Sequence, residues 1–366
     1  MKQEFVVTAT ETLRSYAAGV LSYLTKYDSI SLKNIDAIDS ILVKRFADGE
    51  MEVEVTTSIR GKDVIVFSSS ARNEAGLDVN EAKIQLYQTI DALKRSRCEN
   101  IIVFEPYVSC ARSDRPLSRN SVGLWVHFKT LVSLGTSHIV TYQLHSDKSK
   151  AMLDPALCLL DDIPVLTLLK KYLCDNYIKD LETLENVVRK TWAFCSVDAG
   201  GEKLTRRFAN AFGSPLVIAH KQRDYSKTNT VESINILSAE PLEGKVLWIV
   251  DDMIDTGGSM ISLINALVKM NPKEINIVAV HAPFSGQAAQ KLAELCKQQI
   301  LNNIIVTDTI YFPPSIPAIL PNLKIVSSQE LSARVLRNIV SNASLAPIHD
   351  SFNAQEYLKN QDLFLS

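Results

Sequence analysis

Short apolar runs rich in Val and Ile alternate with longer amphipathic stretches along almost the whole chain, and this alternation limits the possible folds more than any other feature. Such runs occupy residues 63–70, 100–107, 138–145, 192–197, 215–220, 245–250, 274–280, 302–307 and 323–327. A continuous apolar run followed by a helix-length segment is typical of a parallel strand buried on both faces. We therefore predict an α/β fold of largely parallel sheets flanked by helices.

The chain length and the breaks in this pattern predict two similar domains. At roughly 150 residues per domain, 366 residues are enough for two. Asp-Pro, Asp-Asp and Ile-Pro pairs interrupt the pattern within residues 154–164. We predict a first domain over residues 1–160, a second over residues 161–346, and a tail over residues 347–366 with irregular structure and one short helix.

Charge and cysteine content exclude several classes of protein. Lys and Arg number 39 against 41 Asp and Glu, which is not the excess of positive charge typical of a nucleic-acid binder. The chain contains no apolar run of about 18 residues and starts with no secretory or transit pattern. Its six cysteines form no C-x-x-C pair, so we expect reduced, buried thiols. We predict a cytoplasmic protein that binds neither nucleic acid nor membrane.

The strongest local motif joins an apolar strand over residues 246–250 to a helical stretch over residues 260–270. Backbone N–H groups at such a helix N-terminus can bind a phosphate. The residues of this predicted phosphate cradle are Asp255, Thr256, Gly257, Gly258 and Ser259. Just before them, Asp251 and Asp252 can accept hydrogen bonds from vicinal sugar hydroxyls. The motif predicts a ribose phosphate site; the alternative is a plain turn with a helix cap.

A second glycine turn follows the apolar run at residues 192–197 and precedes a helical stretch over residues 204–212. This pattern also favours an anion near a helix N-terminus, although a left-handed turn with a helix cap remains the alternative. The residues in this turn that we single out are Asp198, Gly200, Gly201 and Lys203.

Three further segments carry charged or aromatic side chains next to predicted strands. Arg112, Asp114 and Arg115 follow the run at residues 100–107, and guanidinium groups suit polyphosphate oxygens, although a surface salt-bridge cluster is the alternative. His145 ends the run at residues 138–145, a place where a histidine is more often a structural hydrogen bonder.

The segment over residues 45–50 contains Asp-Gly before an alternating stretch, which by itself indicates a hairpin turn. A basic pair, Lys221 and Arg223, leaves the run at residues 215–220 and enters a polar segment. Such a pair can neutralise charge that develops on a transferred phosphoryl group, or it can be part of a solvated loop.

Residues 250–259 resemble the fingerprint of the type I phosphoribosyltransferase folds, and their Asp-Asp-Met-Ile-Asp-Thr sequence is most similar to the ribose-phosphate pyrophosphokinases. Residues 45–61 match the N-terminal domain of that family, which simple transferases lack. The resemblance extends from about residue 45 to residue 344. It implies two phosphoribosyltransferase type I domains, the first binding ATP and the second binding ribose 5-phosphate.

The resemblance also implies a role for each motif. Adenine and the triphosphate are bound in the first domain by Phe46, Asp48, Glu50, Arg112, Asp114, Arg115 and His145. Ribose 5-phosphate is held by residues 251–259, and diphosphate by the turn at residues 198–203. His145 and Asp198 contact Mg²⁺, and Lys221 and Arg223 stabilise the transition state.

The implied reaction is transfer of the β,γ-diphosphoryl group of Mg-ATP to the anomeric hydroxyl of ribose 5-phosphate, giving phosphoribosyl diphosphate and AMP. Relatives assemble as dimers that build hexamers, so a homo-oligomer is expected. Two alternatives stay open: a non-catalytic regulatory homologue, and a phosphoribosyltransferase. The retained catalytic pair and the retained fingerprint count against the first, and the duplicated domain counts against the second.

The chain departs from the family pattern at several places. Gln143 replaces the aspartate of the family's Asp-Leu-His, which puts one contact to the metal or its surroundings in doubt. Residues 119–125 and the longer C-terminal tail replace family segments that support oligomer packing or regulation by ADP and phosphate. These substitutions predict altered allosteric regulation.

Overall fold

The computed structural model describes residues 4–26, 39–222, 233–349 and 352–360. Inter-residue contacts divide the chain into two compact units. Unit 1 consists of Met1–Pro164, Thr309–Phe312 and Ser327–His349. Unit 2 consists of Val165–Asp308, Pro313–Val326 and Asp350–Ser366.

Unit 1 is built on a parallel five-stranded sheet of order β1-β4-β5-β6-β7. The strands are β1 (Phe5–Ala9), β4 (Asp63–Phe67), β5 (Ile101–Glu105), β6 (His138–Tyr142) and β7 (Leu159–Ile163). The helices are α1 (Arg14–Leu24), α2 (Val79–Arg95), α3 (Gly123–Leu134), α11 (Gln329–Val340) and α12 (Ala346–His349), with a 3₁₀ segment at Asp147–Met152. A separate hairpin pairs β2 (Ile41–Arg45) with β3 (Met51–Val55).

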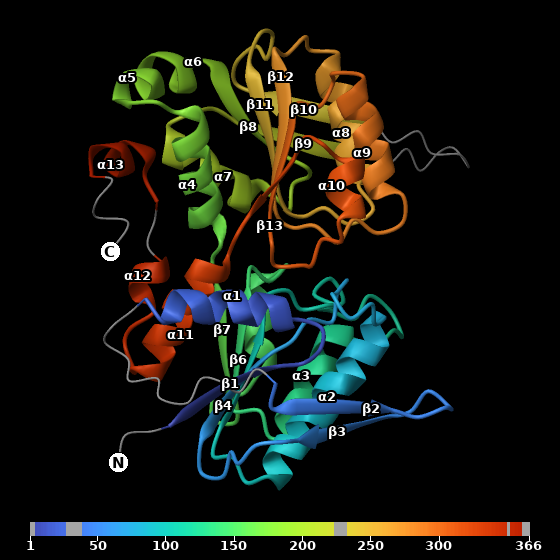
Figure 1. Cartoon of the computed structure of the whole chain (residues 1–366). Helices are drawn as coiled ribbons and strands as arrows, with labels where there is room; N and C mark the ends of the chain where they lie inside the picture. The colour runs from blue at the N-terminus through green and yellow to red at the C-terminus, as the bar shows by residue number, and fades with distance from the viewer. Residues whose placement is uncertain (1–3, 27–38, 223–232, 350–351, 361–366) are drawn as a thin grey trace. The chain divides into compact units, whose positions relative to one another are not determined.

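Both faces of this sheet are covered, which explains why its central strands are apolar throughout. All five residues of β4 and all five of β5 are buried. On one face, alternate strand residues such as Val66 and Val103 pack with α2 and α3 in a single core. On the other face the rings of Phe67 and Phe104 stack with centroids 4.8 Å apart. α1 and α11 lie on this second side (Figure 1).

Unit 2 contains a seven-stranded sheet of order β10-β9-β8-β11-β12-β13-β14, parallel except for the antiparallel edge strand β10. The strands are β8 (Trp192–Ser196), β9 (Leu216–Gln222), β10 (Ser233–Ser238), β11 (Val246–Met253), β12 (Glu274–His281), β13 (Asn303–Thr307) and β14 (Leu323–Val326). The longer helices are α4 (Leu166–Tyr177), α7 (Glu202–Phe212), α8 (Gly258–Val268), α9 (Ala288–Lys297) and α13 (Ala354–Lys359). Short helical turns form α5 (Leu181–Thr183), a π segment (Leu184–Val188), α6 (Arg189–Thr191) and α10 (Ser315–Ile319).

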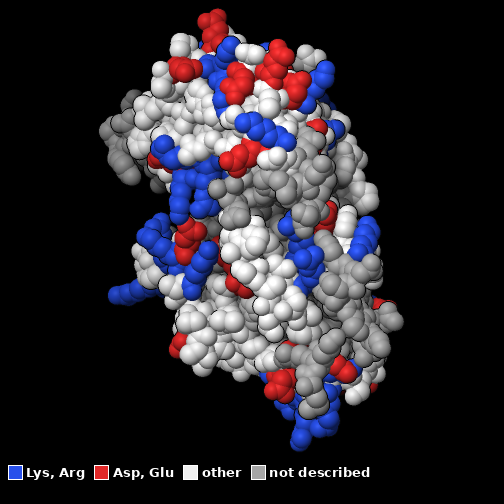
Figure 2. Space-filling model, turned by 90° about the vertical axis from the view of Figure 1, so that its left-hand side faces the viewer, with Lys and Arg blue, Asp and Glu red and all other residues white. Residues whose placement is uncertain are grey.

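The predicted α/β class is confirmed, because both main sheets are wholly or largely parallel and are flanked by helices (Figure 1). No helix in the described part of the chain is long and apolar enough to span a membrane. All six cysteines are free thiols, and four of them are buried: Cys98, Cys158, Cys174 and Cys195. Basic and acidic side chains are interspersed on the face shown in Figure 2, in keeping with their near balance in the sequence.

The chain first passes from unit 1 to unit 2 between Pro164 and Val165, close to the predicted division after residue 160. β7 occupies the stretch in which Asp-Asp interrupts the apolar pattern. It is an edge strand, and three of its five residues are partly or fully exposed, so the pattern is weak there.

Helix α11 groups with unit 1, although the sequence predicts residues 161–346 as one domain. The side chains that hold it are buried hydroxyls. Tyr16 of α1 makes 2.7 Å hydrogen bonds with both Ser328 and Ser332. Ser332 also bonds the hydroxyl of Tyr142 at the end of β6. The chain thus returns to unit 1 after β14, because α11 buries its polar contacts against α1 and β6.

The C-terminal helix α13 packs in unit 2. Phe352, Ala354 and Tyr357 are buried, and the Tyr357 hydroxyl donates a 2.6 Å hydrogen bond to Asp175 of α4. The ammonium of Lys171 lies over the Tyr357 ring, 5.3 Å from its centroid. The tail does contain a short helix, and that helix is anchored to α4.

Replacing Tyr357 with phenylalanine should therefore destabilise unit 2. The substitution keeps the ring but removes a hydrogen bond to a carboxylate, a loss of about 1.5–3 kcal/mol. Thermal denaturation should show a lower Tm for Tyr357→Phe than for Tyr172→Phe. Tyr172 is the matched control on α4, because it is a partly buried tyrosine and burial is the only cause that raises its pKa. Equal Tm values for the two variants would contradict this account of the tail.

Candidate active site

Three of the predicted segments in unit 2 leave neighbouring strands of the same sheet. β8 pairs with β11 on one side, where Ser196 lies opposite Val250, and with β9 on the other, where Ser196 lies opposite Ile218. All three strands run parallel, so the segments after them emerge at one edge of the sheet. Ligands of open parallel sheets bind at this carboxyl edge.

The predicted phosphate cradle forms a turn that leads into α8. β11 runs through Asp251 and Asp252 to Met253, and α8 begins at Gly258. Gly257 precedes the helix with a left-handed backbone, φ 74°. Thr256, Gly258 and Ser259 are exposed at this end of the helix. The backbone N–H groups of the first turn of α8 are therefore placed where an anion from solvent can reach them.

Asp251 lies in an electrostatically unfavourable position. Burial of its carboxyl, the negative charge of Asp252 and a side-chain hydrogen bond with Asp252 raise the pKa of Asp251 well above its usual range, and the charge of Asp198 adds to this effect. Asp251 Oδ1 also accepts a 2.9 Å hydrogen bond from the Asp252 backbone N–H. Carboxylates held this close favour a proton, a hydroxyl donor or a cation between them.

The second predicted turn lies beside the first. Asp198 follows β8, its Oδ1 accepts a 3.0 Å hydrogen bond from the Gly201 N–H, and α7 begins at Glu202. Asp198, Gly200 and Lys203 are exposed. Asp198 is close enough for its charge to act on Asp251. Two turns that each precede a helix N-terminus are thus brought together at one sheet edge.

Of the basic pair, Lys221 lies in a strand and not in the polar segment after it. Lys221 was predicted in a loop beyond the strand, but β9 continues to Gln222 and Lys221 pairs with Ile234. This prediction was wrong because β10 adds to the edge of β9 and extends it by hydrogen bonding, a long-range pairing that no local pattern reveals. Arg223 lies outside the described residues.

In unit 1 the residues predicted to bind triphosphate follow β5. A turn closes where the Ser113 N–H donates a 2.8 Å hydrogen bond to the Cys110 carbonyl. Ser113 Oγ in turn accepts a 2.9 Å hydrogen bond from the Gly123 N–H at the start of α3. Arg112 and Arg115 are exposed on this loop. Both arginine side chains are therefore open to solvent on this loop.

His145 follows the neighbouring strand β6 and is exposed. The backbone bends sharply before it, because Gln143 adopts a left-handed conformation with φ 42°. Asp162 of β7 stabilises the segment: its Oδ1 accepts a 2.9 Å hydrogen bond from the Leu144 N–H, and its Oδ2 lies 3.1 Å from Lys150 Nζ. Asp162 was not predicted from the sequence, because the Asp-Asp pair was interpreted as part of a domain boundary.

The predicted adenine loop lies at the tip of the β2–β3 hairpin. The Phe46 N–H donates a 2.8 Å hydrogen bond to the Glu50 carbonyl, and Asp48 Oδ1 accepts a 3.1 Å hydrogen bond from the Glu50 N–H. Gly49 supplies the left-handed residue that the turn needs, with φ 94°. The Phe46 side chain is 50 % exposed, so part of its ring is open to solvent, as stacking on a flat ligand requires.

The hairpin is a separate two-stranded sheet, so its tip does not belong to the carboxyl edge that carries the loop of Arg112 and the segment of His145. In Figure 1 it extends away from the five-stranded sheet. The predicted ATP residues of unit 1 thus occupy two places on this unit.

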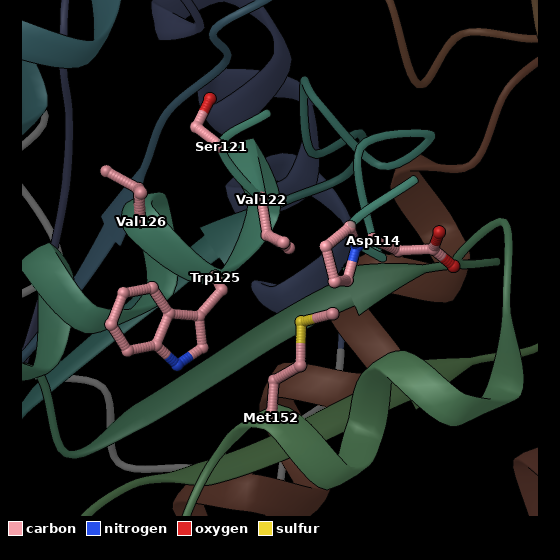
Figure 3. Close-up of a pocket in the computed structure, with 7 residues that line it drawn as sticks. Asp114, Ser121, Val122, Trp125, Val126 and Met152 are labelled. Carbon is pink, nitrogen blue, oxygen red and sulfur yellow. The ribbon is translucent and has the colours of Figure 1, made fainter. Parts of the chain in front are cut away.

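A pocket of ≈ 500 Å³ opens next to the loop of Arg112. It is lined by Asp114, Pro116, Ser121, Val122, Trp125, Val126 and Met152. In Figure 3 Trp125 and Asp114 lie on opposite sides of the view, with Met152 between them. The mostly apolar lining of this pocket does not suit a triphosphate.

The described residues contain no group of three or more His, Cys, Asp or Glu side chains able to hold a metal ion. Mg²⁺ usually keeps several waters and is bound by one or two protein carboxylates together with substrate phosphates. A magnesium site therefore does not require a cluster of three protein ligands. The raised pKa of Asp251 marks a place in unit 2 where negative charge is in excess. These features of the donor groups are compatible with magnesium that arrives with the nucleotide.

Replacing Gly257 with alanine tests the geometry of the cradle. A Cβ on this residue meets no atom closer than 3.7 Å, so the cost comes from the left-handed backbone, about 1–2 kcal/mol. We expect a lower Tm for Gly257→Ala and weaker binding of a phosphorylated ligand at this turn. Gly258→Ala is the control for stability, since its backbone is not left-handed and its Cβ would meet open space. A Gly257→Ala protein as stable as Gly258→Ala would contradict the expected strain.

Comparisons with known proteins agree on one family. The model of the N-terminal domain of ribose phosphate pyrophosphokinase matches residues 9–135, and the phosphoribosyl transferase domain model matches residues 177–311. The ribose-phosphate pyrophosphokinase of Mycoplasma genitalium is 32 % identical over 74 % of this chain and 75 % of its own. That of Campylobacter jejuni is 29 % identical over 88 % of this chain and 93 % of its own.

A solved structure extends this agreement to the fold. The crystal structure of phosphoribosylpyrophosphate synthetase from Mycobacterium smegmatis matches with a TM-score of 0.78 at 25 % identity, covering 93 % of this chain and 100 % of that one. The predicted pair of phosphoribosyltransferase-type domains is therefore confirmed. With both family models matched in order and relatives above 30 % identity along most of their length, the chain belongs to the ribose-phosphate pyrophosphokinase family.

Proposed function

We propose that the chain transfers the β,γ-diphosphoryl group of Mg-ATP to the anomeric hydroxyl of ribose 5-phosphate. The oxygen of that hydroxyl attacks the β-phosphorus, its proton is released, and the bond from the β-phosphorus to the oxygen bridging to the α-phosphorus breaks. The products are phosphoribosyl diphosphate and AMP. The observation that carries this proposal is the pair of turns after β8 and β11, with Asp198 acting electrostatically on Asp251.

Unit 2 supplies the sugar site in this proposal. The first turn of α8, over residues 255–259, binds the 5-phosphate through backbone N–H groups and hydroxyls. Asp251 and Asp252 accept hydrogen bonds from the ribose hydroxyls, which supply the donors that two close carboxylates favour. The turn of Asp198, Gly200, Gly201 and Lys203 receives the transferred diphosphate.

Unit 1 supplies the nucleotide site. Phe46 stacks on adenine, and the carboxylates of Asp48 and Glu50 contact its amino edge. Arg112 and Arg115, with Asp114 beside them, bind the triphosphate by charge-assisted hydrogen bonds. The exposure of both arginines and of the Phe46 ring supports this assignment.

His145 and Asp198 would each provide a ligand to magnesium, which neutralises phosphate charge when it is bound. Lys221 and Arg223 neutralise the negative charge that develops on the transferred group. Phosphoryl transfer relies on positioning and charge stabilisation more than on covalent chemistry, so cationic side chains suffice for this role.

The proposal includes the homo-oligomer that the resemblance implies, in which dimers build a hexamer. It also includes a cytoplasmic location. The six free thiols fit a reducing compartment. Sedimentation of the active protein tests the assembly, and an active monomer would contradict it.

The test of the reaction is direct. Purified protein with ribose 5-phosphate, ATP and Mg²⁺ should form AMP and phosphoribosyl diphosphate in equal amounts. ADP as product would instead indicate a simple kinase. A folded protein that binds ATP but forms no product would favour the non-catalytic homologue, and product formation from a nucleobase and phosphoribosyl diphosphate would favour a phosphoribosyltransferase.

A further inference from the structure

A chain of buried polar side chains lies beneath the loop of Arg112 in unit 1. Glu105, the last residue of β5, is fully buried and receives hydrogen bonds from two directions. Its Oε2 lies 2.7 Å from His127 Nε2, and its Oε1 accepts a 3.3 Å hydrogen bond from Ser70 Oγ. Ser70 Oγ is also 2.7 Å from Ser109 Oγ. A fully buried carboxylate is costly unless its partners are in place, so these contacts specify one arrangement.

The partners come from four different elements. Ser70 follows β4 and Ser109 follows β5, while His127 belongs to α3. His127 Nδ1 lies 2.9 Å from the Tyr87 hydroxyl of α2. Burial, and secondarily the charge of Glu105, raises the pKa of Tyr87 to about 12, so this hydroxyl keeps its proton over the physiological range. The network thus joins two helices to the carboxyl ends of two neighbouring parallel strands.

The bond between Glu105 and His127 also closes the loop that carries the predicted triphosphate residues. These two residues are 22 positions apart, and Arg112, Asp114 and Arg115 lie between them. Within the closed segment Ser113 is bonded to the start of α3 through Gly123. A loop whose ends are tied has fewer conformations, so its side chains need less ordering when a ligand binds.

Helix α2 holds the same loop at a second point. Lys83, one turn before Tyr87, donates a 3.1 Å hydrogen bond to Cys110 Sγ. Cys110 has a left-handed backbone with φ 67°, a conformation that non-glycine residues keep only where the surroundings enforce it. The backbone just before Arg112 is therefore held by a side chain of α2.

We infer that Glu105, His127, Ser70 and Ser109 are positioning residues for the nucleotide: through the Ser70–Ser109 hydrogen bond they fix the loop of Arg112 in the geometry that binds the triphosphate. This inference rests on the proposed function, because it takes Arg112 as a triphosphate ligand. It assigns no contact with substrate to the four residues. The network therefore affects the affinity for Mg-ATP through the loop of Arg112, and it does not affect the affinity for ribose 5-phosphate in unit 2.

The variant Ser109→Ala isolates the link between network and loop, since it leaves the Glu105–His127 pair intact. We expect it to raise the KM for Mg-ATP by about 2- to 10-fold, the range for loss of one buried hydrogen bond, with the KM for ribose 5-phosphate unchanged. Ser70→Ala should have a similar effect. Because both variants remove the same bond, the double variant should be no worse than the more impaired single variant.

Ser40→Ala is the matched control. Ser40 is also buried in unit 1, and its Oγ donates a 2.9 Å hydrogen bond to Thr8 Oγ1. It should lower the Tm about as much as Ser109→Ala while leaving the KM for Mg-ATP at the wild-type value. If Ser70→Ala and Ser109→Ala lower the Tm but leave the KM for Mg-ATP unchanged, the network has only a structural role and the inference fails. Strictly additive effects of Ser70→Ala and Ser109→Ala on the KM for Mg-ATP would also contradict it.

Arg112→Ala separates this inference from the proposed function. A KM for Mg-ATP that is unchanged in Arg112→Ala would overturn the triphosphate role of the loop itself, and the positioning inference with it. A raised KM in Arg112→Ala together with a wild-type KM in Ser109→Ala would refute positioning alone. Equilibrium binding of Mg-ATP to the same variants, without ribose 5-phosphate, gives a second readout that does not depend on turnover.

Discussion

Replacing Lys221 with alanine should lower kcat by about 10³-fold or more while the affinity for Mg-ATP stays close to that of the wild type. The reason is that a cation acting on developing phosphate charge contributes mainly in the transition state, and a cationic side chain in this role is worth about 10³–10⁵-fold in kcat. The measurement is steady-state kinetics of AMP formation together with direct Mg-ATP binding.

Lys269→Ala is the control for this variant. Lys269 is exposed at the opposite end of α8 from the fingerprint, so the same loss of charge should leave kcat unchanged. Equal losses of ATP affinity and turnover in Lys221→Ala would show that the lysine binds the ground state, and the transition-state role would have to be abandoned.

The second large effect concerns Asp251, for which stability and activity should change in opposite directions. Asp251→Asn removes an acceptor for a sugar hydroxyl. A hydrogen bond to a charged group is worth about 1.5–3 kcal/mol, so the KM for ribose 5-phosphate should rise by roughly 10- to 100-fold. Steady-state kinetics with ribose 5-phosphate as the varied substrate measures this change.

The unliganded Asp251→Asn protein should nevertheless be more stable at neutral pH. Burial and the neighbouring Asp252 raise the pKa of Asp251, so the folded state binds its proton more tightly than the unfolded state does. The stability of the wild type therefore falls as the pH rises from the ordinary aspartate range through the raised value. Asparagine has no such proton to lose, and a gain of about 1 kcal/mol corresponds to a Tm increase of roughly 2–4 °C for a unit of this size.

Thermal denaturation across pH tests this second effect. The difference in Tm between Asp251→Asn and the wild type should grow as the pH rises, whereas the exposed carboxylate control Glu294→Gln on α9 should show no such trend. The predicted gain in stability would be contradicted if Asp251→Asn were less stable than the wild type at pH 7. The predicted sugar contact would be contradicted if its KM for ribose 5-phosphate were unchanged.

The local turns show how far a sequence pattern can be taken. Gly257 and Gly49 were singled out as parts of turns, and both have the left-handed backbone that glycine allows. The strand before Asp251 and the helix after it can be predicted from the spacing of apolar residues alone. A buried parallel strand is a continuous apolar run, whereas a helix has apolar residues every three or four positions. Such features depend on residues close together in the chain, so the chain itself specifies them.

Several functional details could not be read in this way. The network of Glu105 and His127 joins residues 22 positions apart, and Ser70 approaches Ser109 across two strands. The extension of β9 through Lys221 depends on pairing with β10. The raised pKa of Asp251 depends in part on Asp198, which follows another strand. Each of these requires knowledge of which strands are neighbours, and strand order is not encoded in any short window of sequence.

Sequence patterns were enough to predict the α/β class, nine of the twelve strands of the two main sheets, the fingerprint of Asp251–Ser259 and, through resemblance, the family. These depend on side-chain periodicity and on motifs of about ten residues. Three features became visible only in the folded chain: the packing of α11 against α1, the electrostatic effect of Asp198 on Asp251, and the closure of the loop of Arg112 by the buried Glu105–His127 pair. The physical reason is that these contacts are made between distant segments, whose meeting is fixed by the burial of both faces of the sheets.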